Sequence, residues 1–218
     1  MNFDTLKAPE GDIKVFFIGH GTLYFENNNQ VIHVDPWSQL GDYNQIPKAD
    51  IILITHDHPD HLDPAVIDQI SKNNTVIISP QIVFDKIKKG KVLANGESLT
   101  EKGIKIEAVP AYNNSQGREM FHPKGAGNGY ILNLAGMRIY IAGDTEDIPE
   151  MSRISQIDVA FLPMNQPYTM LPQQLKKAAL TIKPKVLYPY HYGETDTSEL
   201  LEIMKDQPSI EVRIRALQ

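Results

Sequence analysis

Short runs of apolar and β-branched residues recur along the chain, separated by turns rich in glycine, asparagine and proline. The first three runs, residues 14–18, 22–26 and 31–34, follow one another across short turns, which predicts an antiparallel meander of strands. Residues 51–54 are four consecutive apolar residues, a pattern typical of a strand that is buried on both faces. The chain therefore begins as a β-rich fold that needs cover on its sheet faces.

Helical periodicity begins directly after the fourth of these runs. Asp63 is a favourable N-cap, Pro64 suits the first helical position, and Val66, Ile67 and Ile70 then share one face. The same patterns predict further strands at 75–78, 104–109, 130–134, 137–141, 158–162 and 185–188, and further helices at 81–89 and 173–180. Strands and helices thus alternate over most of the chain.

The order of these elements repeats itself once. Residues 127–129 (Gly-Asn-Gly) echo residues 19–21 (Gly-His-Gly) at a shift of 108, and Asp144 follows a strand as Asp35 does, at a shift of 109. Each half is then a meander followed by a β-α-β unit, with helices to cover one sheet face. The two sheets must bury their other faces on each other. We expect an α/β fold with one domain over residues 1–218, a four-layer α/β/β/α sandwich of two similar halves.

Composition excludes several classes of function. The 218 residues are 41% hydrophobic and 22% charged, as in ordinary globular proteins, and the net charge of −6 makes duplex nucleic acid a poor partner. The absence of cysteine removes disulfides, thiolate metal sites and cysteine nucleophiles. No basic start precedes an apolar run, and no stretch approaches the ~18 apolar residues of a membrane span. We expect a cytoplasmic protein with a small-molecule substrate; its oligomeric state is not predicted.

The densest polar cluster directly follows the buried strand at 51–54. Three histidines and two aspartates lie within residues 56–61, on a predicted loop between strand and helix, where open α/β sheets bind ligands. Imidazole and carboxylate are ligands for Zn²⁺ and similar ions. His56 and His58 alternate on extended backbone and can share one metal, whereas Asp60 and His61 face elsewhere and could hold another. A solvated polar loop is the alternative, but it does not explain three of seven histidines in six residues.

Other candidates are isolated in the sequence. Asp144 follows a strand and a glycine, and His191 closes the strand at 185–188, so each is a ligand or an ordinary capping residue. His122 lies in a glycine-rich loop, and His20 lies in a turn between two strands. His33 alternates with apolar neighbours on a strand and is interpreted as structural.

The H-x-H-x-D-H pattern of residues 56–61 after an apolar strand resembles the signature of the metallo-β-lactamase superfamily. The resemblance implies that fold and a metal-dependent hydrolase, with one or two divalent ions, Zn in first place and Mn or Fe as alternatives. In such enzymes a metal-bound hydroxide attacks an ester, lactone or phosphoester. The resemblance implies that one ion is held by His56 and His58, a second by Asp60, His61 and His191, with Asp144 bridging them and Asp60 also handling the proton.

The chain departs from the family pattern at one ligand. The family usually offers a third histidine to the first ion, but the aligned residue is Asn113, whose amide oxygen is a weak zinc ligand. His122 or water could fill the place, so we expect the first ion to be held less tightly. The stretch from Gly19 to Thr22 resembles the G-H-x-T motif of a branch that includes ascorbate-phosphate lactonases and N-acyl-phosphatidylethanolamine phospholipases D. His20 is then a contact beside the metals or, alternatively, a turn cap.

Two other functions stay open at this point. Related folds use the same centre for non-hydrolytic di-iron chemistry, and the missing histidine at Asn113 would suit a metal-binding module without catalysis. Arg118 and Lys124 lie in a loop that could close over the site, where they would bind an anionic group, or they are ordinary solvated cations. Metal analysis and a panel of hydrolysable substrates distinguish these functions.

Overall fold

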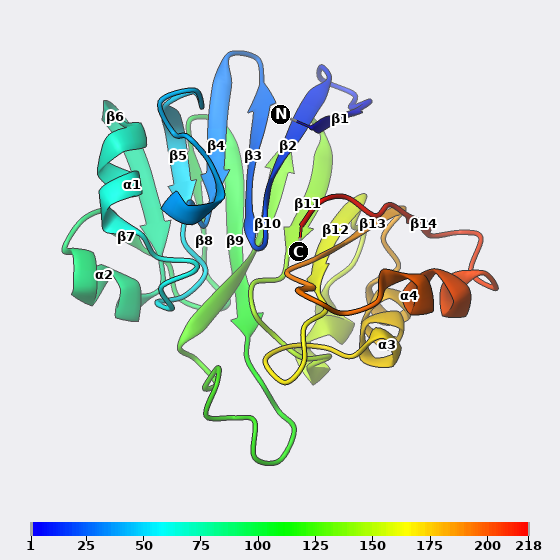
Figure 1. The fold of residues 1–218 in the computed structure, drawn as a ribbon. Helices are drawn as coiled ribbons and strands as arrows, with labels where there is room; N and C mark the ends of the chain where they lie inside the picture. Colours follow the sequence, from blue (N-terminus) through cyan, green and yellow to red (C-terminus); the bar gives the residue numbers. More distant parts are fainter. Residues whose placement is uncertain (1, 218) are drawn as a thin grey trace.

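Two seven-stranded sheets face each other at the centre of the molecule (Figure 1). The structure is a computed structural model, and it describes residues 2–217. The strand order is β1-β2-β3-β4-β5-β6-β7 in the first sheet and β14-β13-β12-β11-β10-β9-β8 in the second. Each sheet is therefore built from one half of the chain, which confirms the two-halved α/β sandwich predicted from the repeat.

The first sheet is antiparallel from β1 to β4 and parallel from β4 to β7. Its strands and helices, in chain order, are β1 (Phe3–Leu6), β2 (Ile13–Gly19), β3 (Thr22–Asn27), β4 (Gln30–Val34), the 3-10 helix η1 (Ser38–Leu40), β5 (Ala49–Leu53), α1 (Pro64–Ile70), β6 (Ser71–Ser79), α2 (Gln81–Ile87) and β7 (Lys91–Val92). The meander and the following β-α-β unit are both where the apolar runs predicted them.

The second sheet has the same mixture, antiparallel from β8 to β11 and parallel from β11 to β14. Its elements are β8 (Ser98–Glu101), β9 (Ile104–Ala111), β10 (Gly127–Leu134), β11 (Met137–Ile141), the 3-10 helix η2 (Pro149–Arg153), β12 (Val159–Pro163), α3 (Pro172–Ile182), β13 (Val186–Tyr190), α4 (Thr197–Met204) and β14 (Glu211–Val212). Both sheets thus change from antiparallel to parallel pairing at their fourth strand along the chain.

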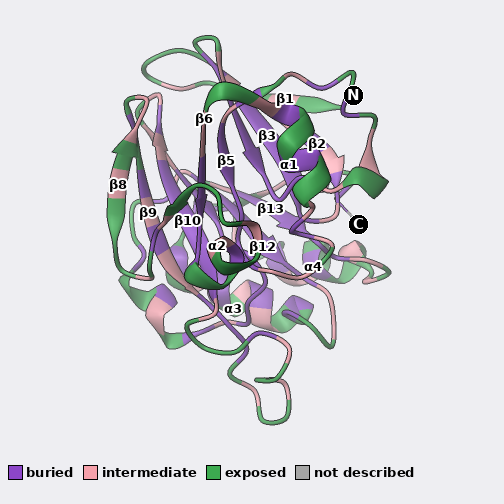
Figure 2. Cartoon of the chain, turned by 90° about the vertical axis from the view of Figure 1, so that its left-hand side faces the viewer, coloured by how far each residue is buried: buried purple, intermediate pink, exposed green. Residues whose placement is uncertain are grey.

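Alternation along β5 explains the layers. Ile51 and Leu53 belong to the apolar core that also contains residues of the second sheet, whereas Ile52 packs with Val66 and Ile67 of α1. Figure 2 shows the inner strands mostly buried, the edge strand β8 largely exposed and the outer faces of the helices exposed. The run at 51–54 is consequently apolar at every position, because one face meets the other sheet and the other face meets a helix.

Two residues have the structural roles that the sequence predicted for them. The Asp63 side chain accepts hydrogen bonds from the backbone N–H groups of Ala65 and Val66, which caps α1. His33 is structural, as predicted, because its Nε2 lies 2.9 Å from the Pro47 carbonyl and its side chain is fully buried.

Several short elements were not predicted, among them β1, β7, β14, α4 and the two 3-10 helices. β1 and β14 are edge strands that pair over four and two residues, too short for a pattern to show. Among the helices of residues 2–217, none is long and apolar enough to cross a membrane.

Candidate metal centre

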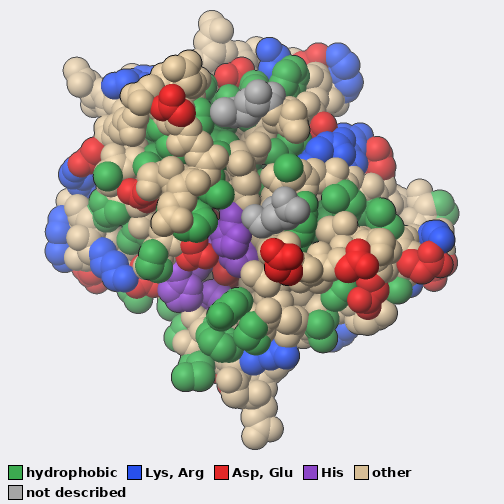
Figure 3. Space-filling view, in the orientation of Figure 1, with side chains coloured by type: hydrophobic (Ala, Val, Ile, Leu, Met, Phe, Trp, Pro, Cys, Tyr) green, Lys and Arg blue, Asp and Glu red, His purple; other side chains and the backbone are tan. Residues whose placement is uncertain are grey.

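The candidate ligands come from five separate connections and meet at one edge of the sandwich. His20 lies between β2 and β3, residues 56–61 between β5 and α1, and His122 between β9 and β10. Asp144 follows β11 and His191 follows β13. In Figure 3 the histidines gather in a hollow at the centre of the molecule, with acidic side chains beside them. Segments far apart in the sequence therefore build one site.

The first group of donors is His56, His58 and His122, each offering one ring nitrogen within 4.8 Å of the others. His56 and His122 are buried and His58 is half-buried. His122 thus occupies a position beside the H-x-H pair, which the sequence left open between this histidine, Asn113 and water.

The second group is His20, Asp60, His61 and His191, whose donor atoms also lie within 4.8 Å of one another. Asp60 Oδ2 is 3.0 Å from His20 Nε2, 3.8 Å from His61 Nε2 and 3.7 Å from His191 Nε2. The His20 and His191 rings are 3.7 Å apart between centroids. His20 is therefore beside the candidate ligands, as the G-H-x-T resemblance implied, and its backbone carbonyl also accepts a hydrogen bond from the His191 N–H.

Asp144 lies between the two groups. Its Oδ2 is 3.3 Å from His122 Nε2 and 3.3 Å from His191 Nε2, while its Oδ1 is 3.6 Å from His61 Nε2. The side chain is buried, so these imidazoles replace water around the carboxylate. Its two oxygens therefore face donors of both groups, which is the arrangement of a bridging ligand.

Buried polar atoms without a hydrogen-bond partner converge here. A buried donor or acceptor left unpaired costs about 1–3 kcal/mol, so folded proteins keep few of them. Here the atoms concerned are Nε2 of four histidines and one carboxylate oxygen: His56, His61, His122, His191 and Asp144 Oδ1. Imidazole nitrogen and carboxylate oxygen are the donors that divalent transition metals take, so the residues present suit such ions.

Hydrogen bonds on the far side of three rings turn their Nε2 atoms toward the centre. His61 Nδ1 lies 2.8 Å from Asp35 Oδ2, and both side chains are fully buried. Because a carboxylate can only accept, His61 donates from Nδ1, and Nε2 is the nitrogen that remains to coordinate an ion. The glycine at position 21 makes room for this ring, since a Cβ there would come within 2.7 Å of His61 Cε1.

His56 and His122 are oriented in the same way. Thr55 Oγ1 donates to Asp35 Oδ2 at 2.6 Å, so it accepts from His56 Nδ1 at 2.9 Å. Asn113 Nδ2 donates to the Tyr168 carbonyl at 2.9 Å, and Asn113 Oδ1 therefore accepts from His122 Nδ1 at 2.7 Å. Both atoms of the Asn113 amide group are thus engaged with protein partners.

Two carboxylates at the site were missed by sequence reasoning. Asp35, which accepts from Thr55 N, Thr55 Oγ1 and His61 Nδ1, holds the H-x-H-x-D-H loop in place. Glu146 is fully buried and accepts from the backbone N–H groups of Asn114 and Ser115. It therefore ties the loop that carries His122 to the segment that carries Asp144. The internal repeat could have indicated Asp35, because Asp35 is the counterpart of Asp144 in the first half. No sequence pattern indicates Glu146.

Electrostatics keep the two candidate carboxylate ligands ionised. Burial acts to raise the pKa of Asp60, but hydrogen bonds to His191 and His20 and the charge of His61 hold it below the usual range. For Asp144 the neighbouring histidines likewise outweigh burial and lower the pKa. Burial opposes protonation of His61, yet Asp144, Asp35 and Asp60 together raise its pKa to about 9. An ion bound by this ring therefore has to displace the proton of Nε2, and metal binding should weaken as the pH falls.

The centre opens to solvent through a cleft of about 480 Å³. Besides the candidate ligands, its lining residues are Pro59, Met120, Phe121, Asn165 and Tyr168. Arg118 and Lys124, which the sequence placed in a loop over the site, are not among the lining residues, and they pair with Glu146 and Glu150 instead.

Comparisons with known proteins agree with this geometry. Residues 14–191 match the family described as "Beta-lactamase superfamily domain". A UPF0173 metal-dependent hydrolase of Pyrococcus abyssi is 30% identical over 219 residues, covering 92% of this chain and 96% of its own.

Two solved structures extend the likeness to three dimensions. A protein from Parabacteroides distasonis described as a metal-dependent hydrolase is 52% identical, with a TM-score of 0.97 over 100% of this chain and 99% of its own. Igni18, a metallo hydrolase from Ignicoccus hospitalis, is 26% identical, with a TM-score of 0.80 over 94% of this chain and 95% of its own. Sequence, fold and the donor cluster together place the chain in the beta-lactamase superfamily, as a member of the UPF0173 metal-dependent hydrolase family.

Proposed function

We propose that the protein is a hydrolase with a two-ion centre that cleaves an ester, a lactone or a phosphoester. One ion is held by His56, His58 and His122, the other by Asp60, His61 and His191, and Asp144 bridges them. The observation that carries this proposal is the convergence of buried, unpaired Nε2 and carboxylate atoms on one point. Membership of the metal-dependent hydrolase family supports it.

In this proposal His122 takes the place of the histidine that the family pattern expects at Asn113. Three observations support the exchange. His122 Nε2 is buried without a hydrogen-bond partner, this atom lies 3.3 Å from Asp144 Oδ2, and Nδ1 of the same ring donates to Asn113 Oδ1. Asn113 is then a residue that orients the ligand. The first ion has three imidazole ligands after all, so the weaker binding expected from the sequence no longer follows.

Bound zinc, or manganese or iron, would supply Lewis acidity and lower the pKa of a water toward neutrality. The chain's own groups hold and orient the reactants. Asp60, whose side chain is 33% exposed, reaches the cleft and is the carboxylate that would handle the proton. His20 donates to that oxygen from Nε2 and fixes its direction, the role that the G-H-x-T resemblance to the lactonase and phospholipase branch suggests. The cleft next to Asp60 and Asp144 receives the small-molecule substrate, and we propose that the protein is cytoplasmic.

The test is metal analysis and turnover with protein purified without added metal. We expect two zinc or manganese ions per chain and hydrolysis of at least one ester, lactone or phosphodiester. His56→Ala and Asp144→Asn should each lower the metal content and abolish turnover, whereas the exposed Asp68→Asn on α1 should change neither. Two iron ions without hydrolysis would favour the di-iron function, and one ion without turnover a binding module; either result would overturn the proposal.

A further inference from the structure

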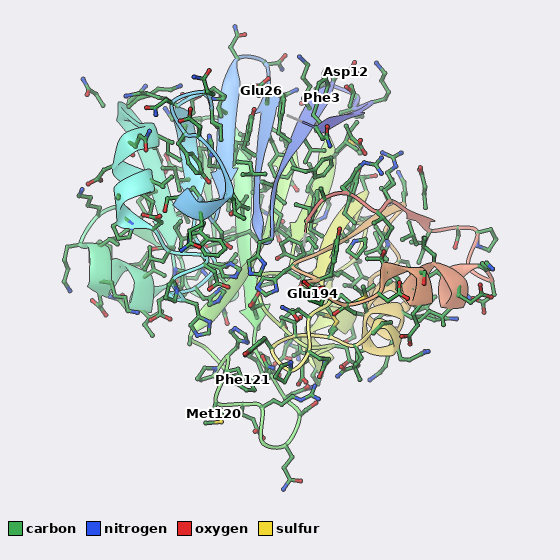
Figure 4. All side chains as sticks on the ribbon, in the orientation of Figure 1. Phe3, Asp12, Glu26, Met120, Phe121 and Glu194 are labelled. Atoms are coloured by element: carbon green, nitrogen blue, oxygen red, sulfur yellow. The ribbon has the colours of Figure 1, made fainter. Side chains whose placement is uncertain are left out.

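The wall of the cleft opposite the histidines is apolar. Met120 and Phe121 directly precede His122 on the loop between β9 and β10, and Tyr168 faces them from the loop between β12 and α3. The Phe121 and Tyr168 rings meet edge to face with centroids 5.1 Å apart. In Figure 4 Met120 and Phe121 lie on the loop below the centre, and Figure 3 shows hydrophobic side chains directly beneath the histidines.

Two of these three side chains are exposed to solvent, and Phe121 between them is half-buried. Met120 is 78% exposed and Tyr168 45%, and they are among only six large hydrophobic residues exposed within residues 2–217. Apolar surface that stays in water costs about 25 cal/mol per Å², so a cluster of it beside a candidate active site indicates a surface that binds something.

Positive charge does not reach the cleft. No lysine or arginine lines it among the described residues. The nearby cations are each engaged in an ion pair: Arg118 with the buried Glu146, Lys124 with Glu150 and Lys86 with Asp57. Sites that bind phosphate groups usually supply arginine or lysine donors to the free oxygens, and this wall has none to offer.

We propose that the substrate is an uncharged carboxylic ester or lactone whose apolar chain or ring lies against Phe121, Met120 and Tyr168. This inference rests on the proposed function and narrows its substrate class. A phosphoester carries a negative charge, and no lysine or arginine among the residues lining the cleft neutralises it. Water adds across the acyl C–O bond: its hydroxyl goes to the acyl carbon and its proton to the leaving oxygen, giving an acid and an alcohol. Asn165 is the uncharged polar side chain of the lining that can orient the carbonyl.

The first experiment compares substrates that share one leaving group. kcat/KM is measured for p-nitrophenyl acetate, butyrate, hexanoate and octanoate, and for p-nitrophenyl phosphate and bis(p-nitrophenyl) phosphate, with metal-loaded protein. Each methylene that reaches the apolar wall should raise kcat/KM by up to about fourfold, the equivalent of ~0.8 kcal/mol. Both phosphates should be turned over more slowly than hexanoate.

Variants identify the wall as the cause. Phe121→Ala should lower kcat/KM for octanoate by roughly tenfold and for acetate by less than about twofold, because only the long chain reaches the ring. The control is Phe3→Ala, an exposed phenylalanine at the opposite end of the molecule in Figure 4, which should leave the chain-length series unchanged. Metal content is measured for both, since Phe121 adjoins His122.

Binding gives a readout independent of turnover. In metal-free protein, ligand-observed NMR should detect 2-nonanone, a neutral compound without a cleavable bond, and the signal should weaken in Phe121→Ala. Phenyl phosphate should give no such signal. Binding of phenyl phosphate in place of the ketone, or a phosphate that is cleaved faster than every ester, would overturn this inference and leave the hydrolase standing. No turnover of any substrate by fully metal-loaded protein would overturn the proposed function, and the inference with it.

Discussion

Asn113 offers the sharpest test of how the centre is built. In the structure its amide holds His122 by accepting from Nδ1, and it anchors itself by donating to the Tyr168 carbonyl. Asn113→Leu keeps the volume of the side chain and removes both hydrogen bonds. If His122 is a ligand, its ring then loses the partner that fixes its tautomer and direction.

The magnitude follows from what is left unpaired. The His122 Nδ1–H would remain buried without an acceptor, which costs about 1–3 kcal/mol, and for a chain of this length each kcal/mol lowers Tm by about 2–4 °C. Partners that orient metal ligands typically contribute 10–100-fold in metal affinity. We therefore expect Asn113→Leu to weaken the first ion 10–100-fold and to leave the second ion nearly unchanged.

The assay is a chelator competition that follows metal release and turnover together. Wild-type protein should lose both ions at similar chelator concentrations. Asn113→Leu should lose one ion at a lower chelator concentration, in a separate weak phase, and its activity should be lost in that phase. Asn114→Leu is the matched control, because the neighbouring side chain is exposed and only its backbone contacts Glu146. His122→Ala should give the same weak phase, and adding Asn113→Leu to it should weaken that phase no further.

Two results would refute the reasoning. If Asn113→Leu binds both ions as tightly as wild type, the hydrogen bond does not position a ligand. If His122→Ala leaves the weak phase absent while Asn113→Leu produces it, the amide itself contacts the ion, and the role assigned to His122 is wrong.

Four further outcomes can be measured. Asp35→Asn replaces the acceptor of His61 Nδ1 and should weaken metal binding 10–100-fold, measured by the same competition. Burial lowers the pKa of His33 to about 4, so below pH 6.5 the unfolded state binds a proton that the folded state does not bind. The free energy of unfolding should therefore fall by about 2 kcal/mol from pH 7 to pH 5. His33→Gln should remove this loss, measured by urea titration at both pH values. Burial acts to raise the pKa of Asp4, but the Arg215 and Tyr188 hydrogen bonds lower it. Asp4→Asn should therefore cost about 1 kcal/mol at pH 7, and progressively less as the pH falls through the lowered pKa of Asp4. When free metal is present at 100 times its dissociation constant, removing it with a chelator should lower the free energy of unfolding by about 2.7 kcal/mol, which is measured as a lower Tm.

Hydrophobic patterns predicted most of the fold, because a strand that is buried on both faces has an uninterrupted run of apolar residues. The strand at 51–54 is apolar throughout since it meets a sheet on one face and α1 on the other. Edge strands have no such run: β14 pairs over two residues, Glu211 and Val212, and its place depends on β13 beside it. α4 was missed although Asp196 caps it and Glu199 lies in its first turn, because those signals adjoin a short and otherwise ordinary apolar pattern.

The site divides in the same way between local and long-range information. His56, His58, Asp60 and His61 could be grouped as candidate ligands from the sequence because one loop carries them, and the structure places their donor atoms in the clusters around Asp144 and His191. The place of His122 was not predictable, because it depends on a hydrogen bond across a nine-residue loop and on Glu146, which fixes that loop from another strand end. A pattern shows which residue types are available, but only tertiary contacts decide which of them face the same point.

The internal repeat explains why one centre forms between two similar halves. Asp35 and Asp144 are equivalent by position, each following a strand of its own sheet, yet their oxygens do different things. Those of Asp35 are fully engaged by Thr55 and His61, so it can only orient a ligand, whereas Asp144 Oδ1 is buried and unpaired. The first half supplies the histidine loop and the residue that holds it, and the second half supplies the carboxylate that we propose as the bridge. Neither half contains a complete donor set, so the packing of the two sheets is what assembles the centre.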